Sequence, residues 1–401
     1  MDKKPEKLVP EVRFKGFTDD WEQRKLGDVV NFFSGLTYHP SDVKNKGYFV
    51  IRSSNIQNNQ IVSADDIFVN KDIINVPNVK QGDIIVVVRN GSRKLIGKHA
   101  QVLTDMPNTV IGAFMTGVRS KSNFYINALL DSDQFQKEIY KNLGATINQI
   151  TIGEFRKMRF IITSGNEAQT IGEFFKKIDT LITLQQRKLK QLNLLQRYIK
   201  EKTLPSQKEL PKLRFLTTPY NTYKFSELFK KSTKKNDGQI LQNHVISVAS
   251  MRWGKLPKSS SEAYMKTYFI FNKGDIAYEG NRSKSYSFGR FVANDLGNGI
   301  VSHVFSVFNS KINFNLEFLK NYINSEQVMR DPLRMSTSRT TMMTNLVLKD
   351  IAKQTLMIPS KDEQDLLGSL YKITQSMIEL NEKQQQELIY LKKYLLQKLF
   401  I

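Results

Sequence analysis

The stretch Phe174-Phe175-Lys176 through Leu181-Ile182-Thr183-Leu184 decides the fold, because it recurs 196 residues later as Leu370-Tyr371-Lys372 through Met377-Ile378-Glu379-Leu380. The same offset holds on both sides of this stretch, for the pairs Gly172 and Gly368, Leu192 and Leu388, Leu195 and Leu391, and Tyr198 and Tyr394. A period this long does not fit a solenoid. The sequence therefore predicts a duplicated unit, in which a globular module is followed by a helix.

The globular parts repeat more loosely. Gln81-Gly82-Asp83-Ile84 resembles Lys273-Gly274-Asp275-Ile276, and Gly97-Lys98 resembles Gly289-Arg290, at an offset of 192. Residues 83–89 and 301–308 are predicted as strands, and residues 125–143 and 316–330 as helices. Matches in the same order in both halves indicate two similar modules of mixed α/β structure that differ by small insertions.

The repeated stretches have the apolar spacing of a coiled coil. Over residues 167–204 and 363–399 apolar side chains recur every three or four residues, and no Pro or Gly follows Gly172 or Gly368 within them. Each helix should be about 55 Å long, with the polar residues Gln185 and Asn381 at matching seam positions. The expected coiled-coil positions are Ile178, Leu181, Leu192, Leu195, Ile199, Met377, Leu388, Leu391 and Leu395.

The predicted architecture is an α+β fold with four segments. Two globular modules, residues 1–163 and 206–359, alternate with a central spacer helix, residues 164–205, and a C-terminal spacer helix, residues 360–401. We expect the two helices to pack antiparallel, separating the domains in a pseudo-twofold duplicated arrangement. The alternative is that both helices are core elements of an ordinary helical domain.

The composition indicates a polyanionic partner. The chain has 401 residues, which predicts two or three domains, and its formal net charge is +22. It has no cysteine, which excludes disulfides and Cys-based zinc sites, and its four histidines lack the close spacing typical of metal ligands. The sequence contains neither a signal peptide nor a membrane-spanning run, so we expect a cytoplasmic protein without a metal centre.

The positive charge lies mainly in the modules. Residues 1–165 contain 23 Lys and Arg against 17 Asp and Glu, and residues 211–360 contain 22 against 10. Residues 361–401 are balanced, with 6 of each. A membrane-binding amphipathic helix would show the opposite distribution. Nucleic acid is therefore the expected partner.

A polar, basic loop follows the Gly-Asp-Ile strand of each module. Arg, Asn, Lys and Ser are the side chains that pair with base edges and phosphates. The expected DNA contacts are Arg89, Asn90, Ser92, Arg93, Lys94 and Lys98 in the first module, and Arg252, Asn281, Arg282, Ser283, Lys284, Tyr286 and Arg339 in the second. Weaker candidates are the segments 52–55, 145–149, 250–253 and 336–340. The alternative for each loop is a solvated hairpin tip.

Motifs for catalysis are missing. Gly97-Lys98 and Gly254-Lys255 lack the Ser or Thr of a phosphate-binding loop, and there is no Gly-x-Ser-x-Gly nucleophile elbow. Thr217-Thr218-Pro219-Tyr220 lacks the Asn and the first Pro of the Asn/Asp-Pro-Pro-Tyr site of amino-methyltransferases. The chain is therefore expected to bind a target, with no catalytic site of its own.

This layout resembles the specificity subunit of type I restriction-modification systems over nearly the full chain. The resemblance rests on the two Gly-Asp-Ile modules, the two helices, the segment Thr18-Asp19-Asp20-Trp21, and the module entries Val9-Pro10-Glu11-Val12-Arg13-Phe14 and Leu210-Pro211-Lys212-Leu213-Arg214-Phe215. It implies that each module reads one half of a bipartite double-stranded DNA target. It further implies that the helices set the spacing and bind two modification subunits.

The resemblance also assigns the chemistry to partners. Modification subunits would use S-adenosylmethionine to methylate adenine N6, and restriction subunits would use ATP and Mg²⁺ to translocate and cleave DNA. No cofactor is expected in this chain, which would be a non-catalytic subunit. The alternatives are a self-contained nucleic-acid-modifying enzyme and a coiled-coil scaffold without sequence-specific DNA binding.

Overall fold

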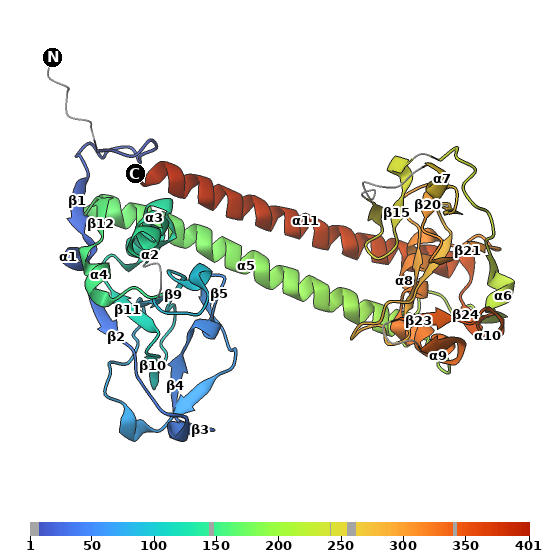
Figure 1. The fold of residues 1–401 in the computed structure, drawn as a ribbon, viewed down its shortest axis with the longest axis horizontal. Coiled ribbons are helices and arrows are strands. Elements are labelled where there is room, and N and C mark those ends of the chain that lie inside the picture. Colours follow the sequence, from blue (N-terminus) through green and yellow to red (C-terminus); the bar gives the residue numbers. More distant parts are fainter. Residues whose placement is uncertain (1–7, 144–147, 241, 255–261, 340–342) are drawn as a thin grey trace, which may run out of the picture. The chain divides into compact units, whose positions relative to one another are not determined.

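The computed structural model describes residues 8–143, 148–240, 242–254, 262–339 and 343–401. It contains two compact units, residues 1–186 with 383–401 and residues 187–382. Each unit holds one globular module and parts of two 39-residue helices, α5 (Gly165–Thr203) and α11 (Lys361–Leu399) (Figure 1). Both helices begin and end within two residues of the predicted ranges.

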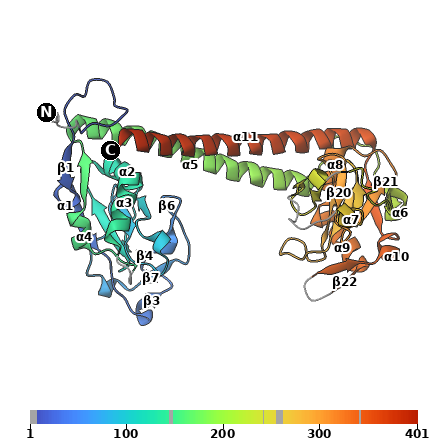
Figure 2. The same ribbon diagram turned by 45° about the horizontal axis from the view of Figure 1, so that its top comes forward.

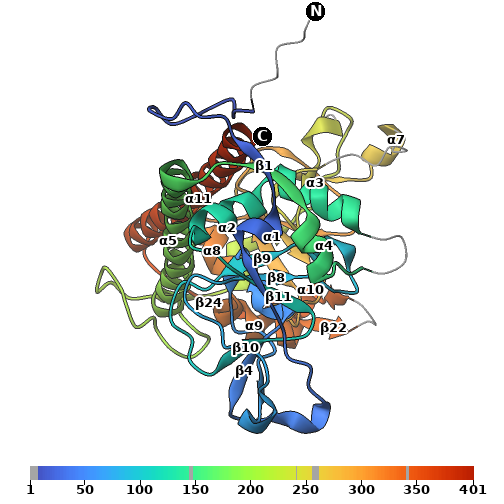
Figure 3. The same ribbon diagram turned by 90° about the vertical axis from the view of Figure 1, so that its left-hand side faces the viewer.

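The first module is built around a four-stranded antiparallel sheet in the order β2-β11-β8-β9. A second four-stranded sheet, β10-β4-β7-β3, lies beside it, and β1 pairs with β12 (Figure 3). Its elements are β1 (Glu22–Lys25), α1 (Leu26–Val29), β2 (Asn31–Ser34), β3 (Val43–Lys44), β4 (Tyr48–Ile51), β5 (Ile56–Gln57), β6 (Gln60–Ile61), β7 (Ile67–Val69), β8 (Ile84–Val87), β9 (His99–Gln101), β10 (Thr109–Ile111), β11 (Met115–Arg119), α2 (Asn123–Asp131), α3 (Asp133–Asn142), α4 (Ile152–Lys157) and β12 (Arg159–Ile162).

Strand β8 is apolar throughout because both of its faces are buried. Ile84 and Val86 belong to a core that also contains residues of α2, α3, α5 and the end of α11. Ile85 and Val87 point to the other side, into a separate core that includes residues of β4, β9 and β10. Successive strand residues point to opposite faces, so a central strand between two cores needs apolar side chains at every position.

The second module is coloured yellow to orange in Figure 2. It repeats the central sheet as β14-β21-β18-β19, again antiparallel. Its elements are β13 (Asn221–Lys224), α6 (Phe225–Leu228), β14 (Phe229–Lys231), β15 (Ile246–Ser247), β16 (Arg252–Trp253), α7 (Glu262–Met265), β17 (Phe269–Phe271), β18 (Ile276–Glu279), β19 (Arg290–Ala293), β20 (Gly299–Val301), β21 (Ser306–Ser310), α8 (Leu316–Ile323), α9 (Glu326–Ser336), β22 (Thr337–Arg339), β23 (Thr344–Leu346), α10 (Leu348–Ile351) and β24 (Thr355–Ile358).

The two modules share a central sheet of matching topology, as the repeat predicts, while their smaller sheets differ. Their central sheets correspond strand for strand, and the pairing of β1 with β12 is repeated by β13 with β24. The repeated Asp of Gly-Asp-Ile has the same role in both modules: Asp83 accepts a hydrogen bond from the Lys80 amide, and Asp275 accepts one from the Asn272 amide, each over 2.8 Å. The motif thus closes the turn that leads into the central strand.

Within each unit the long helices pack antiparallel. In the first unit Phe175 of α5 contacts Phe400, just beyond α11, with ring centroids 6.1 Å apart, while Asp179 contacts Lys392. In the second unit Thr203 contacts Tyr371, and Gln196 contacts Gln375. In both units the position on one helix rises as its contact on the other falls. Gly172 allows α5 to approach α2 closely, since a Cβ there would lie 2.6 Å from the Tyr125 amide nitrogen.

Three local predictions need correction. The helix predicted over 125–143 is broken at Ser132, whose Oγ accepts a hydrogen bond from Phe135 N and starts α3. The helix predicted over 316–330 is likewise divided into α8 and α9. The strand predicted over 301–308 is interrupted by a turn between β20 and β21, in which Phe305 N donates to Ser302 O over 3.1 Å. Apolar periodicity does not reveal such one-residue caps and tight turns.

Candidate nucleic-acid interface

The basic loop of the first module begins where β8 leaves the sheet. Arg89 bridges Gln149, Asn90 N donates to Asn148 O over 3.2 Å, and Asn148 Nδ2 returns a bond of 3.1 Å to Gly91 O. These contacts join the 89–94 loop to the second predicted segment, 145–149. Residues 145–147 of that segment lie outside the described residues.

A third predicted segment, residues 52–55, contacts the same loop. Asn90 Nδ2 donates to Ser53 Oγ over 3.1 Å, and Asn55 holds the segment folded by accepting a 2.9 Å bond from the Arg52 amide. Asn90 Oδ1 also accepts a bond from Ser92 N, so the Asn90 side chain stabilises the loop itself. The structure therefore brings together three stretches of the chain that the sequence identified separately.

A fourth segment, absent from the sequence prediction, completes this site. Phe114 lies in the turn between β10 and β11, and its carbonyl oxygen accepts bonds from Val88 N at 3.0 Å and Arg89 N at 3.2 Å. The Arg89 guanidinium carbon lies 5.0 Å from the centroid of the Phe114 ring. From the sequence alone, an aromatic residue just before a strand is most simply interpreted as a core residue. Only alignment of the two modules by strand pairing would have identified this position.

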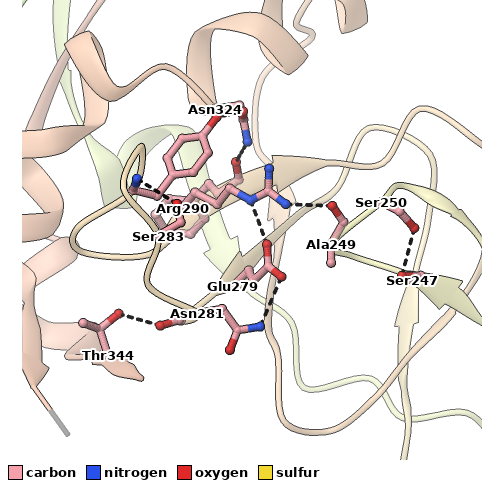
Figure 4. Close-up of polar contacts among 12 residues, drawn as sticks. Ser247, Ala249, Ser250, Glu279, Asn281, Ser283, Arg290, Asn324 and Thr344 are labelled. Carbon is pink, nitrogen blue, oxygen red and sulfur yellow. Dashed lines mark hydrogen bonds and ion pairs between the residues drawn. The ribbon is translucent and has the colours of Figure 1, made fainter. Parts of the chain in front are cut away.

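The loop of the second module is held by a buried ion pair, drawn in Figure 4. Glu279, at the end of β18, is 4% exposed and binds Arg290 Nε over 2.7 Å. Arg290 Nη2 also donates to Ala249 O over 2.7 Å, and Asn281 Nδ2 makes a long contact of 3.4 Å to Glu279 Oε1. Module 1 has Val87 and Lys98 at the matching positions, so this pair is particular to module 2.

The other predicted residues of module 2 surround this loop. Tyr286 donates its hydroxyl proton to Asn324 Oδ1 over 2.7 Å, and the Arg290 guanidinium lies over its ring at 5.1 Å. Thr344 Oγ1 donates to Gly280 O, which ties β23 to the loop, and Arg339 of β22 lies over the Phe288 ring at 5.7 Å. Arg252 lies on β16, three residues from Ala249. Thr340, in the predicted 336–340 segment, lies outside the described residues.

Among the described residues, the predicted cations have no carboxylate partner. In the part of the chain that the structure describes, none of Arg89, Arg93, Lys94, Lys98, Arg252, Arg282, Lys284 and Arg339 forms an ion pair, and all are exposed. Arg119 and Arg290 differ, because Asp83 and Glu279 bind them. The hydrogen bond and charge of Asp83 raise the pKa of Arg119 despite its partial burial. The exposed set is thus available to an anionic ligand.

The predicted coiled-coil residues divide into two groups. Ile178 is buried, Ile199 and Leu395 pack on the module cores, and Leu192 and Leu388 are half-buried. Leu181, Leu195, Met377 and Leu391 are each about half exposed on α5 or α11. No helix among the described residues is long and apolar enough to cross a membrane.

Residues 18–194 match the model of the type I restriction modification DNA specificity domain. This match, which covers less than half of the chain, supports a relationship to the specificity subunits of type I restriction-modification systems. The specificity domain spans the first module and most of α5, and it contains all four segments of the site around Arg89. Phe114 is the residue that the structure adds to this site, whereas Asn148 and Gln149 belong to the weaker candidate segment 145–149.

Two curated relatives are named specificity subunits of type I restriction enzymes. The chain is 28% identical over 173 residues to the type I restriction enzyme StySPI specificity subunit of Salmonella potsdam, which covers 41% of this chain and 36% of that protein. It is 26% identical over 174 residues to the EcoKI specificity subunit of Escherichia coli K12, with the same coverage. The matched part is thus little more than a third of the length of either relative.

Solved structures share the fold over nearly the whole chain. The S subunit of a type I restriction-modification system from M. genitalium superposes with a TM-score of 0.61 at 14% identity, over 98% of this chain and 99% of that one. A chain from a study of complex assembly and conformational transition of the type I system superposes with a TM-score of 0.53 at 13% identity, over 95% and 97%. At such identities the likeness concerns the fold.

Proposed function

We propose that this chain is the non-catalytic, DNA-binding specificity subunit of a type I restriction-modification complex in the cytoplasm. Residues 1–163 and 206–359 each read one half of a bipartite double-stranded target. The observation that carries the proposal is the repetition of the site. Two modules with matching central sheets carry exposed cations, which form no ion pair among the described residues, beside the loop that follows the same strand. Relatives named specificity subunits support it.

The residues of each site divide the work of binding. Arg89, Arg93, Lys94 and Lys98 contact one half-site, and Arg252, Arg282, Lys284 and Arg339 contact the other. Ser92 and Ser283 add hydrogen bonds to phosphate or bases. Asn90, Asn281 and Tyr286, whose side chains bind within their own modules, hold the loops in shape and contact the DNA with what remains free.

The helices set the distance between the half-sites and bind two modification subunits. The half-exposed apolar residues Leu181, Leu195, Met377 and Leu391 support this role, because apolar side chains on a helix surface suit a protein partner. The modification subunits bring S-adenosylmethionine and methylate adenine N6. Restriction subunits, which use ATP and Mg²⁺, join the same complex. This chain determines which DNA sequence the complex recognises.

The decisive test is reconstitution. The full chain is co-expressed with the modification subunits of its own system, and the genomic DNA of the host is sequenced for N6-methyladenine. We expect one bipartite motif, methylated only when both components are present. Exchange of residues 211–359 for the second module of another family member should change one half-site and leave the other intact.

Three results would contradict the proposal. These are failure of the chain to associate with modification subunits, methylation or cleavage of DNA by the purified chain alone, and DNA binding by the complex without sequence preference. Binding must also weaken as salt rises, since phosphate contacts release counterions. Salt-insensitive binding would favour a scaffold role.

A further inference from the structure

Phe114 lies at the base of the module 1 site. It is the third residue of a turn in which Met115 N donates to Gly112 O over 2.9 Å. Its carbonyl oxygen binds the amides of Val88 and Arg89, so the turn and the loop form one continuous surface. The phenyl ring is nevertheless 50% exposed. A large apolar side chain is thus presented to solvent among polar and basic neighbours.

The Phe114 ring lies under the guanidinium of Arg89, a cation without an ion pair in the part of the chain that the structure describes. The Arg89 guanidinium carbon lies 5.0 Å from the ring centroid, and among the described residues no carboxylate forms an ion pair with Arg89. Arg119 stacks on Phe33 at a similar 5.1 Å, but Asp83 occupies its donors. Stacking on a ring restricts a guanidinium to one plane while its edge stays free for a planar acceptor pair.

The second module exposes an apolar residue at the same place. Val118 pairs with Ile84 and Phe308 pairs with Ile276, which makes Val118 equivalent to Phe308 and Phe114 equivalent to Val304. The turn is conserved in form, since Phe305 N donates to Ser302 O. Val304 is 67% exposed. Single exposed apolar residues are common, but the same exposure at equivalent turns in both modules points to a shared ligand.

We propose that Phe114 determines specificity in the half-site read by module 1, an inference that rests on the proposed function. Arg89, held over the ring, presents its two parallel donors to a guanine edge in the major groove. The free edge of the ring contacts the adjacent base pair, where a thymine methyl group is the apolar feature of that groove. Val304 makes the corresponding apolar contact in module 2.

The test uses the full chain assembled with its modification subunits. Binding is measured to an unmethylated duplex that contains the target motif identified by methylation mapping. It is also measured to duplexes in which each base pair of the first half-site is changed in turn. Phe114→Ala should weaken binding to the target about tenfold and flatten the preference at one or two adjacent base pairs. Phe114→Tyr, which keeps a ring for Arg89, should retain the preference. The second half-site should be read as before.

A matched variant separates base reading from phosphate binding. Lys94→Ala removes an exposed cation from the same loop and should reduce the slope of log affinity against log salt by about one, with the base preference unchanged. Phe114→Ala should leave that slope unchanged, because it removes no charge. The melting temperature of each variant should stay close to that of the wild type, since Lys94 is exposed and Phe114 is half exposed.

Defined outcomes overturn the inference. Wild-type affinity and base preference in Phe114→Ala would refute it, as would a loss that follows a lowered melting temperature and is not restored by Tyr. In either case specific binding by the wild-type complex would leave the proposed function standing. A wild-type complex without sequence-specific binding would refute the proposed function and this inference together.

Discussion

Lys392 Nζ of α11 lies 2.5 Å from Asp179 Oδ1 of α5 and 2.6 Å from Asp131 Oδ2 at the end of α2. One repeat period away, the second unit has a neutral pair, in which Gln196 Nε2 donates to Gln375 Oε1 over 2.9 Å. The same helix–helix contact is therefore charged in one unit and uncharged in the other. Burial lowers the pKa of Lys392, but Asp131 and Asp179 outweigh this effect and hold its pKa above the usual value.

Replacing Lys392 should destabilise the first unit. Lys392→Gln leaves the largely buried Asp131 with only His99 and Asn59 as partners and leaves Asp179 without its cation. Removal of one partner from a buried pair costs on the order of 3 kcal/mol. The measurement is the free energy of unfolding in urea at pH 7. Lys393→Gln, at the exposed neighbouring residue, is the matched control. Lys392→Gln with Asp179→Gln should regain part of the loss. Equal stability of the two lysine variants would disprove the role of the buried pair.

Glu167 should make the first unit acid-sensitive. It accepts bonds from Arg13 Nε at 2.6 Å, Thr163 Oγ1 at 2.7 Å and Trp21 Nε1 at 3.2 Å. Burial raises the pKa of Glu167, but these hydrogen bonds together with the Arg13 charge outweigh it and hold the pKa below its usual value. A lowered carboxyl pKa gives stability that is present above about pH 4.3, the usual value for Glu, and lost as the pH falls further.

A Glu167 variant tests the expected loss of stability at low pH. Glu167→Gln should be about 2 kcal/mol less stable than the wild type at pH 7, because hydrogen bonds to a charged group are lost. The gap between their melting temperatures should narrow between pH 5 and about pH 3. A gap that stays constant with pH would show that the ionised carboxylate is not what matters.

Glu279 should control the second half-site without touching DNA. Glu279→Gln weakens the hold on Arg290, which fixes the 280–289 loop, and frees a cation next to the DNA. Discrimination in the half-site read by module 2 should fall about tenfold, as scored by methylation of single-base variants. Asp237→Asn makes the same charge change at an exposed site in the module. The prediction fails if both variants shift discrimination equally, or if the first half-site changes instead.

Longer helices should lengthen the spacer of the target. Seven residues inserted after Gln186 in α5 and seven after Glu382 in α11 add two turns, or about 10 Å, to each helix. Since DNA rises about 3.4 Å per base pair, the methylated motif should gain three base pairs between otherwise unchanged half-sites. Mapping of N6-methyladenine measures this directly. An unchanged spacer in an active complex would contradict the role of the helices as a ruler.

The sequence by itself determined the duplication and the two long helices. The match between residues 174–184 and 370–380, and the three- and four-residue spacing around it, require only local periodicity to be recognised. It also located the basic loops, because Gly-Asp-Ile marks the turn before the same central strand in both modules. These features depend on residues close together along the chain.

Tertiary structure alone decided which residues make each site. Ser53, Asn90, Phe114 and Asn148 lie far apart in sequence and meet through sheet pairing and hydrogen bonds. The opposite states of Arg89 and Arg290, one free and one bound to Glu279, follow from which side chains face them. The charged and neutral helix contacts at Lys392 and Gln196 have the same origin. Long-range contacts depend on how elements pack, so they cannot be predicted from the residues next to a side chain in the sequence.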